Sequence, residues 1–384
     1  MIVKLYQTIS RWSNYRFYSL MLTLGLSTAS IVLSTPSYSS FDSESPSWET
    51  VMLKASDLNH PLNHLDSESG LAKKVYRLSV PLIIRLTGAN EFQTLVLQYC
   101  INFLLLAVCY FLAQRILRDN VSASLITTGI AFIYFGRTGY YDIVCTWFDV
   151  FAYLFLVLSM YSRNFIVVFL SSFAASWTDE RAFIALSIVS LFHWLDNVNI
   201  RKVGNYPVQI WTKCNVAVIT AGITYLLLRL YLATSAGLRT PSWDFSFVLK
   251  KNLTYMQLGT WTFLEGFWIM FFVTIIVTLN RKDYMFTGVI LSISILFVTL
   301  SSVITDITRS GSYLVPIIFV LASYITRTMN SKDVRLVLLV SCLTSIAFPS
   351  FIVCSDWHLS YSIQSSVILE LFPHLVDFAR NNWF

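Results

Sequence analysis

Residues 91–114, EFQTLVLQYCINFLLLAVCYFLAQ, are apolar along most of their length, and Glu91 is the one acidic or basic side chain among them. A helix of this length spans about 36 Å at roughly 1.5 Å per residue, enough to cross a bilayer core of about 30 Å. The rest of the chain has the same character: 55% of its 384 residues are hydrophobic and 12% are charged, whereas a soluble domain has about 25% charged residues. With a mean hydropathy of +0.62, the sequence predicts a polytopic helical membrane protein.

Apolar runs of similar character recur along the whole chain, and we predict about eleven crossings. These are residues 17–34, 91–114, 120–136, 144–161, 164–177, 181–195, 214–233, 261–280, 284–304, 310–326 and 335–354. The expected fold class is all-α, with residues 1–384 forming a single transmembrane domain. The polar stretches 35–90 and 235–260 and the tail 355–384 are expected on the outer face, the first of them with interfacial helices.

Charge predicts the orientation. With a cytoplasmic N-terminus, the cytoplasmic side receives Lys4, Arg11, Arg16, Arg115, Arg118, Arg163, Arg201, Lys202, Lys213, Arg281, Lys282, Arg327, Lys332 and Arg335. It receives only four acids, Asp119, Asp196, Asp283 and Asp333. This excess of basic residues in short connections is the pattern of cytoplasmic loops. The remaining acids then fall mostly on the outer side.

The first outer stretch contains two candidate surface helices. Residues 46–54, PSWETVMLK, mix apolar and polar positions as an interfacial helix does. Residues 71–86 carry Lys73, Lys74 and Arg77 ahead of an apolar run. These basic residues either anchor the helix to anionic lipid headgroups or hold the phosphate of a lipid-linked substrate.

The triplet Asp179-Glu180-Arg181 lies at the tip of a predicted hairpin whose arms, 164–177 and 181–195, are short for full crossings. The tip is therefore expected at or below the outer interface. Ionised groups at that depth are costly and are usually functional or paired. Alternatively, the acids pair with Arg181 while capping the second arm.

Further acids occupy short outer turns. Asp306 and Arg309 lie between two apolar runs, where they either form a local ion pair or provide a phosphate site at the start of the next helix. Asp142 lies in another short outer turn, and Asp149 follows further into the membrane, where it can hold helices together. Asp42 follows the first crossing within a polar loop, where a single acid is normally solvated.

This arrangement resembles the GT-C superfamily of integral-membrane glycosyltransferases, which place an acid soon after the first helix and further acids in later outer loops. The resemblance spans the chain, but its motifs are short. It implies that Asp42 is the first-loop acid and that Asp179 and Glu180 are the later acidic pair. It also implies transfer of a sugar from a polyprenyl-phosphate donor, with inversion at the anomeric carbon. The chain has no large soluble C-terminal region, which favours a monosaccharide transferase over an oligosaccharyl transferase.

The residue types suit that chemistry. A carboxylate can accept the proton of an acceptor hydroxyl, and Asp42 is the expected base, with Asp179 or Glu180 as rivals. Charge on the departing lipid phosphate requires cations. The expected donor-phosphate residues are Arg77, Arg181, Arg309 and Lys74, and the expected supporting residues are Asp142, Asp306 and His64. The sequence identifies no cofactor with certainty, and a divalent metal, Mg²⁺ or Mn²⁺, held by the acids is an alternative to the basic residues.

Other functions fit the same composition. A lipid-linked glycan polymerase or ligase would depend on His64, in the first outer loop, more than on Asp42. A transporter or flippase would place ionisable groups near the midplane, and a noncatalytic subunit of a membrane complex would use the aromatic residues as an interface. The expected partners are the lipid-linked donor, a glycan, lipid or protein acceptor of the cell envelope, and membrane lipids, with no nucleic acid. The bacterial cytoplasmic (inner) membrane is the expected location.

Overall fold

The structure is a computed structural model. It describes residues 7, 15–34, 41–58, 75–143, 145–197, 211–235, 245–304, 306–348, 351–353 and 359–361. Lys73, Lys74, His60 and His64 lie outside the described residues, as does most of the predicted tail 355–384.

The described residues are predominantly helical. In the first half of the chain the helices are α2 (Tyr15–Ser34), α3 (Pro46–Ser56), α4 (Ser79–Thr87), α5 (Glu91–Leu117), α6 (Asn120–Ala131), α7 (Tyr134–Tyr141), α8 (Asp149–Tyr161), α9 (Phe165–Thr178) and α10 (Glu180–Asn197). In the second half they are α11 (Lys213–Ser235), α12 (Phe245–Leu264), α13 (Phe267–Asn280), α14 (Tyr284–Ser302), α15 (Ile307–Ser312), α16 (Ile317–Thr328) and α17 (Ser331–Ala347). Two strands, β1 (Phe351–Val353) and β2 (Leu359–Tyr361), pair antiparallel with Ile352 opposite Ser360.

Four helical segments among the described residues are long and apolar enough to cross a membrane. They are Glu91–Leu117, Lys213–Ser235, Tyr284–Ser302 and Ile307–Thr328. A fifth is formed by Asn252–Leu264 and Phe267–Asn280 if these two helices, which are bent by 82° at the break between them, make one span. The helical prediction is therefore confirmed, and the protein has several helices of the kind found in integral membrane proteins.

Several predicted crossings are interrupted. The run 120–136 is divided between α6 and α7, and the run 144–161 contributes only the helix from Asp149 onward. The run 335–354 ends as a helix at Ala347, and its last residues form β1. The first two interruptions place helix ends in the interior of the bundle, where Ile133 before α7 and Phe148 before α8 are buried.

Local capping explains where individual helices begin and end. Asn90 and Gln93 form a reciprocal capping box at the start of α5, and the backbone leaves the helix at Arg118 with a φ of 54°. Side chains of Asn164 and Asn330 accept hydrogen bonds from the first amides of α9 and α17. Apolar composition makes these segments helical, and the polar caps set their limits.

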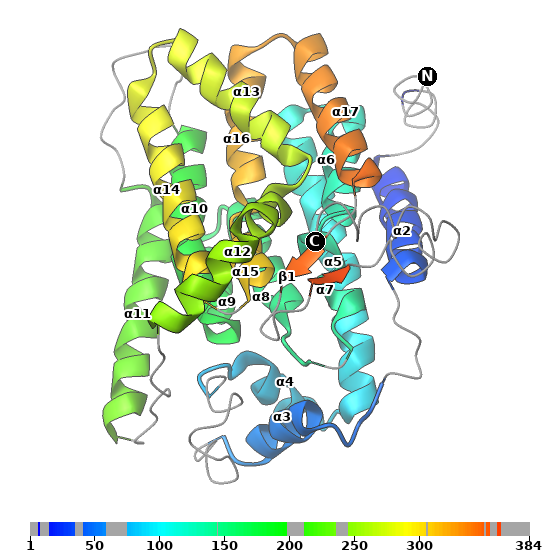
Figure 1. The fold of residues 1–384 in the computed structure, drawn as a ribbon, viewed down its shortest axis with the longest axis vertical. Helices are drawn as coiled ribbons and strands as arrows, with labels where there is room; N and C mark the ends of the chain where they lie inside the picture. The colour runs from blue at the N-terminus through cyan, green and yellow to red at the C-terminus, as the bar shows by residue number, and fades with distance from the viewer. Residues whose placement is uncertain are drawn as a thin grey trace.

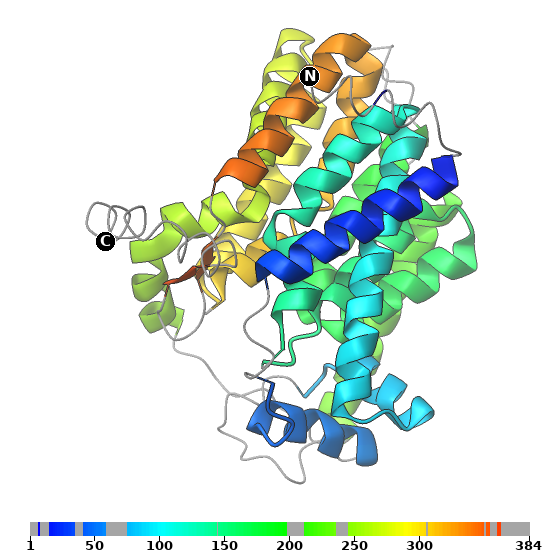
Figure 2. The same cartoon turned by 90° about the vertical axis from the view of Figure 1, so that its right-hand side faces the viewer.

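The bundle has two distinct ends (Figure 1). The connections α13–α14 and α16–α17 lie at one end, and the short helices α3 and α4 lie at the other, beyond the main bundle. The view turned by 90° shows the same separation (Figure 2). We refer to the second end as the α3–α4 end.

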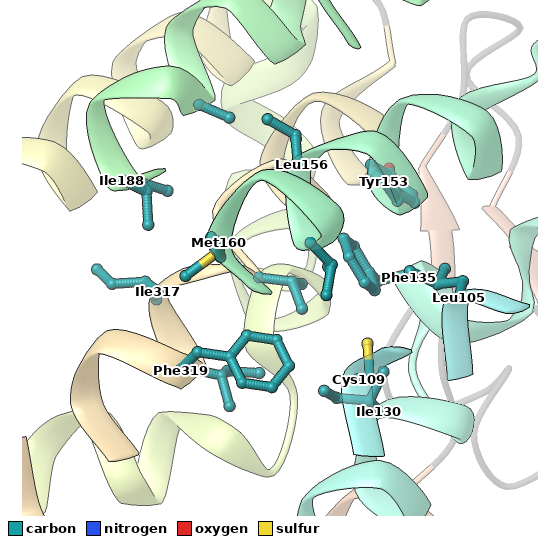
Figure 3. Packing of buried hydrophobic residues seen from close by; sticks show 14 of the residues in the cluster. Leu105, Cys109, Ile130, Phe135, Tyr153, Leu156, Met160, Ile188, Ile317 and Phe319 are labelled. Atoms are coloured by element: carbon teal, nitrogen blue, oxygen red, sulfur yellow. The ribbon is translucent and has the colours of Figure 1, made fainter. Parts of the chain in front are cut away.

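Helix α8 occupies the centre of the core. Figure 3 shows its residues Tyr153, Leu156 and Met160 among apolar side chains of α5, α6, α7, α10 and α16. Tyr153 stacks on Phe135 of α7 with ring centroids 4.2 Å apart. The N-terminus of α8 is consequently surrounded by other elements, and the acidic residue that begins this helix is buried.

Candidate functional site

A buried carboxylate, that of Asp149, lies at the centre of a charged cluster. Asp149 is 1% exposed and begins α8, so its charge is favoured by the positive end of the helix dipole. Its oxygens accept hydrogen bonds from Nε and Nη2 of Arg309, at 2.7 and 3.0 Å. Tyr313 and Tyr134 donate their hydroxyls to the same carboxylate, at 3.2 and 3.3 Å. This one acid therefore connects α7, α8, α15 and the turn that follows α15.

The turn between α9 and α10 supplies the second part of the cluster. Asp179 is fully buried, and its oxygens accept hydrogen bonds from Nε and Nη2 of Arg181 at 2.7 and 2.6 Å. Its Oδ1 also accepts the backbone amide of Arg181 at 3.0 Å, which caps α10. Arg181 Nη2 lies 3.6 Å from Asp149, and Arg309 Nη2 lies 3.8 Å from Asp179. The two carboxylates and two guanidinium groups thus form one continuous network.

Arg309 also contacts groups outside that core. Its Nη1 donates to Asp306 at 2.7 Å, and its guanidinium lies 4.1 Å from the ring centroid of Trp147. The turn before α15 is held by Asn252 of α12, whose buried amide nitrogen donates to the carbonyls of Ser302 and Ile304 at 2.8 and 2.7 Å. Arg309 is therefore positioned by α12 as well as by its own helix.

Arg77 and Glu180 extend the network towards the α3–α4 end. Arg77 precedes α4, and its Nη2 lies 3.0 Å from both Asp179 and Glu180, while its Nε lies 3.3 Å from Glu180. Glu180 retains 38% of its side-chain exposure, in contrast to Asp179. The residue before α4 is held at the end of α9, because the backbone amide of Leu78 donates a hydrogen bond to the carbonyl of Trp177 at 3.0 Å. Three guanidinium groups therefore face four carboxylates, which leaves one formal negative charge in excess.

The electrostatics of the α9–α10 turn keep its acids ionised. Burial by itself raises the pKa of Asp179, but the guanidinium groups of Arg181 and Arg77 outweigh burial and hold this pKa well below its ordinary value. Partial burial likewise raises the pKa of Glu180, and the charge of Arg77 more than offsets that effect, so the pKa is lowered. Both carboxylates are therefore proton acceptors rather than donors at neutral pH.

A narrow cleft opens beside this network, and its free volume of about 20 Å³ has room for one or two water-sized groups in this state. Its polar lining includes Lys54 of α3 and Arg77, and its walls include Trp147 and the apolar residues Val80 and Pro81. Lys54 is 3% exposed. The cleft thus combines two cationic side chains with an apolar surface, a combination that suits an anionic headgroup with a hydrocarbon stem.

The cleft is shaped by the segment that joins α7 to α8. Asp142 accepts hydrogen bonds from the backbone amides of Cys145, Trp147 and Phe148. Helix α3 packs onto this segment, since Trp48 Nε1 donates to the carbonyl of Ile143 at 2.9 Å. Asp142 therefore organises the loop that carries Trp147.

The structure brings six of the predicted residues into the network: Arg77, Asp179, Glu180, Arg181, Asp306 and Arg309. Asp142 lies in the adjoining loop. Asp42, the expected base, is exposed just before α3, and its Oδ1 accepts the backbone amide of Glu44 at 2.9 Å. Among the described residues, no ion pair includes Asp42. Lys74 and His64 lie outside the described residues.

Sequence reasoning gave too little weight to three residues. It treated Asp149 as a helix-bridging acid rather than as the centre of the network, and it gave Lys54 and Trp147 no site role. An acid within an apolar run is itself a signal of a buried partner, but the identity of that partner depends on the tertiary fold. The signal at Lys54 was weak, because a lysine on a surface helix is normally solvated.

Two further buried charges lie in the bundle. Arg137 of α7 and Glu265, at the break between α12 and α13, are both 0% exposed. Arg137 Nε donates to the carbonyl of Ala131 at 3.2 Å, and the charge of Glu265 acts on the guanidinium. The sequence analysis assigned no role to either residue.

The donor set does not fit a divalent metal. The oxygens of Asp149 and Asp179 face guanidinium and hydroxyl donors. No group of three or more His, Cys, Asp or Glu side chains in the described part of the chain is arranged to hold a metal ion.

Comparison with known proteins gives no match to a family model, to a curated protein or to a solved structure.

Proposed function

We propose that the protein is a membrane glycosyltransferase that transfers a sugar from a polyprenyl-phosphate donor to a cell-envelope glycan, lipid or protein acceptor. The observation that carries this proposal is the convergence of three guanidinium groups and four carboxylates from separate turns beside a cationic, partly apolar cleft. Eleven crossings, a cytoplasmic N-terminus and an outer α3–α4 end belong to the same proposal, as does the bacterial inner membrane.

The proposed reaction uses the residues in distinct roles. The acceptor hydroxyl oxygen forms a bond to the anomeric carbon while the bond from that carbon to the phosphate oxygen breaks, and its electron pair stays on the phosphate. A carboxylate accepts the hydroxyl proton. Arg77, which lines the cleft, stabilises the charge that develops on the phosphate. Arg181 and Arg309 hold Asp149 and Asp179 and thereby fix the turn that carries Glu180.

Among the candidate bases, the structure favours Glu180 over Asp179. Asp179 is enclosed and accepts three hydrogen bonds from Arg181, whereas Glu180 is partly exposed and lies beside the cleft residue Arg77. Asp42 remains the alternative base. Asp42 is not among the residues that line the cleft.

The test measures release of polyprenyl phosphate from radiolabelled polyprenyl-phosphate sugars by the purified full chain in nanodiscs, with envelope extracts as acceptor. Glu180→Gln is expected to lower the transfer rate by about 10² to 10⁴, the usual contribution of a general base. Asp42→Asn is expected to have a smaller effect. If His64→Ala abolishes transfer while Glu180→Gln and Asp42→Asn do not, the polymerase or ligase assignment replaces this one.

A transporter or flippase is the second candidate, and a separate observation favours it. The 82° break between α12 and α13 carries the buried Glu265, and broken helices with buried charges form the binding sites of many transporters. Movement of a fluorescent polyprenyl-phosphate lipid between leaflets of reconstituted vesicles would identify this activity. Loss of movement on Glu265→Gln, without any sugar transfer by the unaltered protein, would favour the transporter.

A further inference from the structure

Arg77 lines the cleft, but its ion pair with Glu180 occupies two of the nitrogens that could bind an anion there. Two nitrogens of Arg77 face Glu180, at 3.0 and 3.3 Å, while one nitrogen also contacts Asp179. The carboxylate of Glu180 therefore holds Arg77 in the two-point geometry that a phosphate would adopt. Glu180 is also the most exposed carboxylate of the network, at 38% against 15% for Asp306 and 0% for Asp149 and Asp179.

The remaining nitrogen of Arg77 is available for another acceptor. Nη1 is buried and has no hydrogen-bond partner among the described residues. A buried donor without a partner is unfavourable, and such a group commonly marks a ligand or an ordered water. Since Arg77 lines the cleft together with Lys54, an anion there can contact both cations.

We propose that the cleft between α3, α4 and the α7–α8 segment binds a phosphate-bearing headgroup, which replaces Glu180 on Arg77. Lys54 is the second cation of this site, and Glu180 is an internal substitute for the ligand when the cleft is empty. The inference rests on the proposed function for the identity of the lipid, and it adds a residue and an exchange step to it.

Charge and packing favour this exchange. The network has an excess negative charge, and Asp179 keeps Arg181 and one side of Arg77 in place when Glu180 leaves. The departing carboxylate moves towards water, where its charge is solvated. Trp147, Val80 and Pro81 provide an apolar wall for the first carbons of a lipid stem. The released Glu180 is then free to accept a proton next to the bound headgroup.

The test is a binding titration of the purified full chain in nanodiscs, with polyprenyl monophosphate and inorganic phosphate as separate probes and polyprenyl alcohol as the uncharged control. Glu180→Gln removes the competing charge and is expected to tighten phosphate binding about tenfold, whereas Lys54→Met is expected to weaken it about tenfold. Glu49→Gln, on the exposed side of α3, and Lys332→Met, at the far end of the bundle, are the matched controls and are expected to bind as the unaltered chain does. Thermal unfolding of each variant identifies any loss of fold.

The two probes distinguish the source of the phosphate. Tighter binding of polyprenyl monophosphate than of inorganic phosphate supports a lipid headgroup, and equal binding supports a free phosphate ligand. The proposal is overturned if folded Glu180→Gln binds phosphate no more tightly than the unaltered chain, or if Lys54→Met binds it equally well. If both variants change phosphate binding as expected but the protein transfers no sugar, the phosphate site is supported and the transferase function is rejected. If the protein transfers sugar but the two variants leave phosphate binding unchanged, only the exchange of Glu180 for phosphate is rejected.

Discussion

Asp149 shows how much a single side chain contributes to this molecule. Its carboxylate accepts charge-assisted hydrogen bonds from Arg309 and hydroxyl bonds from two tyrosines, all within the protein interior. A buried network of this kind is stable only when each charge has its partners, because desolvation of an unpaired ion is costly. At the residue scale, these contacts of Asp149 therefore hold the turn after α15 and the start of α8 together.

We predict that Asp149→Asn destabilises the folded protein by about 3 to 5 kcal/mol, the usual cost of removing one partner of a buried ion pair. Arg309 would then retain Asp306 but lose its two-point partner. Denaturant unfolding in mixed micelles measures the change. Asp42→Asn serves as the comparison, since Asp42 is exposed and its replacement should alter the unfolding free energy by less than about 0.5 kcal/mol.

Asp119 lies at the end of the bundle opposite α3 and α4, and its contribution to the unfolding free energy depends on pH. It caps α6 through Ser122 and accepts a hydrogen bond from Arg335 of α17 at 3.0 Å. Burial alone raises the pKa of Asp119, and the bonds from Ser122 and Arg335 outweigh that effect, so this pKa is lowered in the folded protein.

The folded state consequently binds fewer protons at Asp119 than the unfolded state. Its stabilising contribution is complete above the unfolded pKa of about 4 and is lost as the pH falls through the lower folded value. We expect the unfolding free energy of the unaltered chain to fall more steeply between about pH 5 and pH 2 than that of Asp119→Asn. Identical slopes for the two proteins would contradict the assignment.

At the scale of elements, the break between α12 and α13 sets how these helices pack against α15 and α17. Helix α12 ends at Leu264, α13 starts at Phe267 at an angle of 82°, and α12 supports α15 through a hydrogen bond between Thr262 and Thr308. The break is tightly packed, because a Cβ on Gly266 would meet the backbone of α17 at Ser341 and Ser345. The path of α12, and so the position of α15, depends on that close approach.

We predict that Gly266→Ala destabilises the protein by about 1 to 3 kcal/mol, as overpacking does in a filled core. Gly288 of α14 is the matched control, since a Cβ there meets no atom within 4 Å. Gly288→Ala is expected to be neutral or to stabilise the helix by up to about 1 kcal/mol. Unfolding of both variants in the same micelles provides the measurement, and equal effects would reject the packing argument.

At the scale of the whole molecule, the network is adjacent to one end of the bundle and the basic helix connections are at the other. The cleft is lined by α3 residues, while the pairs Asp119–Arg335 and Asp196–Arg163 link helices near the connections at the opposite end. The proposed orientation assigns the first end to the outer side of the membrane, because the basic residues favour the cytoplasm.

Labelling with a membrane-impermeant maleimide tests this orientation. In a chain whose native cysteines have been replaced, Glu49→Cys is expected to react in intact cells, and Lys332→Cys is expected to react only in inverted vesicles. Both positions are exposed in the fold. Reaction of the two cysteines from the same side of the membrane would overturn the proposed topology.

The helical class and the four or five long apolar helices could be predicted from the sequence alone, because hydropathy and length are local properties of runs such as 91–114. The full set of eleven predicted crossings is not confirmed among the described residues. It also indicated that Asp179, Glu180, Arg181 and Arg309 are unusual, since a charge beside an apolar run requires a partner.

The pairing of the charges could not be predicted from the sequence, because it depends on how the helices pack. Arg77 and Glu180 are 103 residues apart, and Asp149 and Arg309 are 160 apart, so their pairing depends on the packing of α4 on α9 and of α15 near α8. The interruptions of the predicted runs at α7 and at Glu265 had the same origin, because burial against neighbouring helices outweighs local helix preference. Lys54 became a residue of the cleft for the same reason: the docking of α3, rather than the sequence around it, removes that lysine from water.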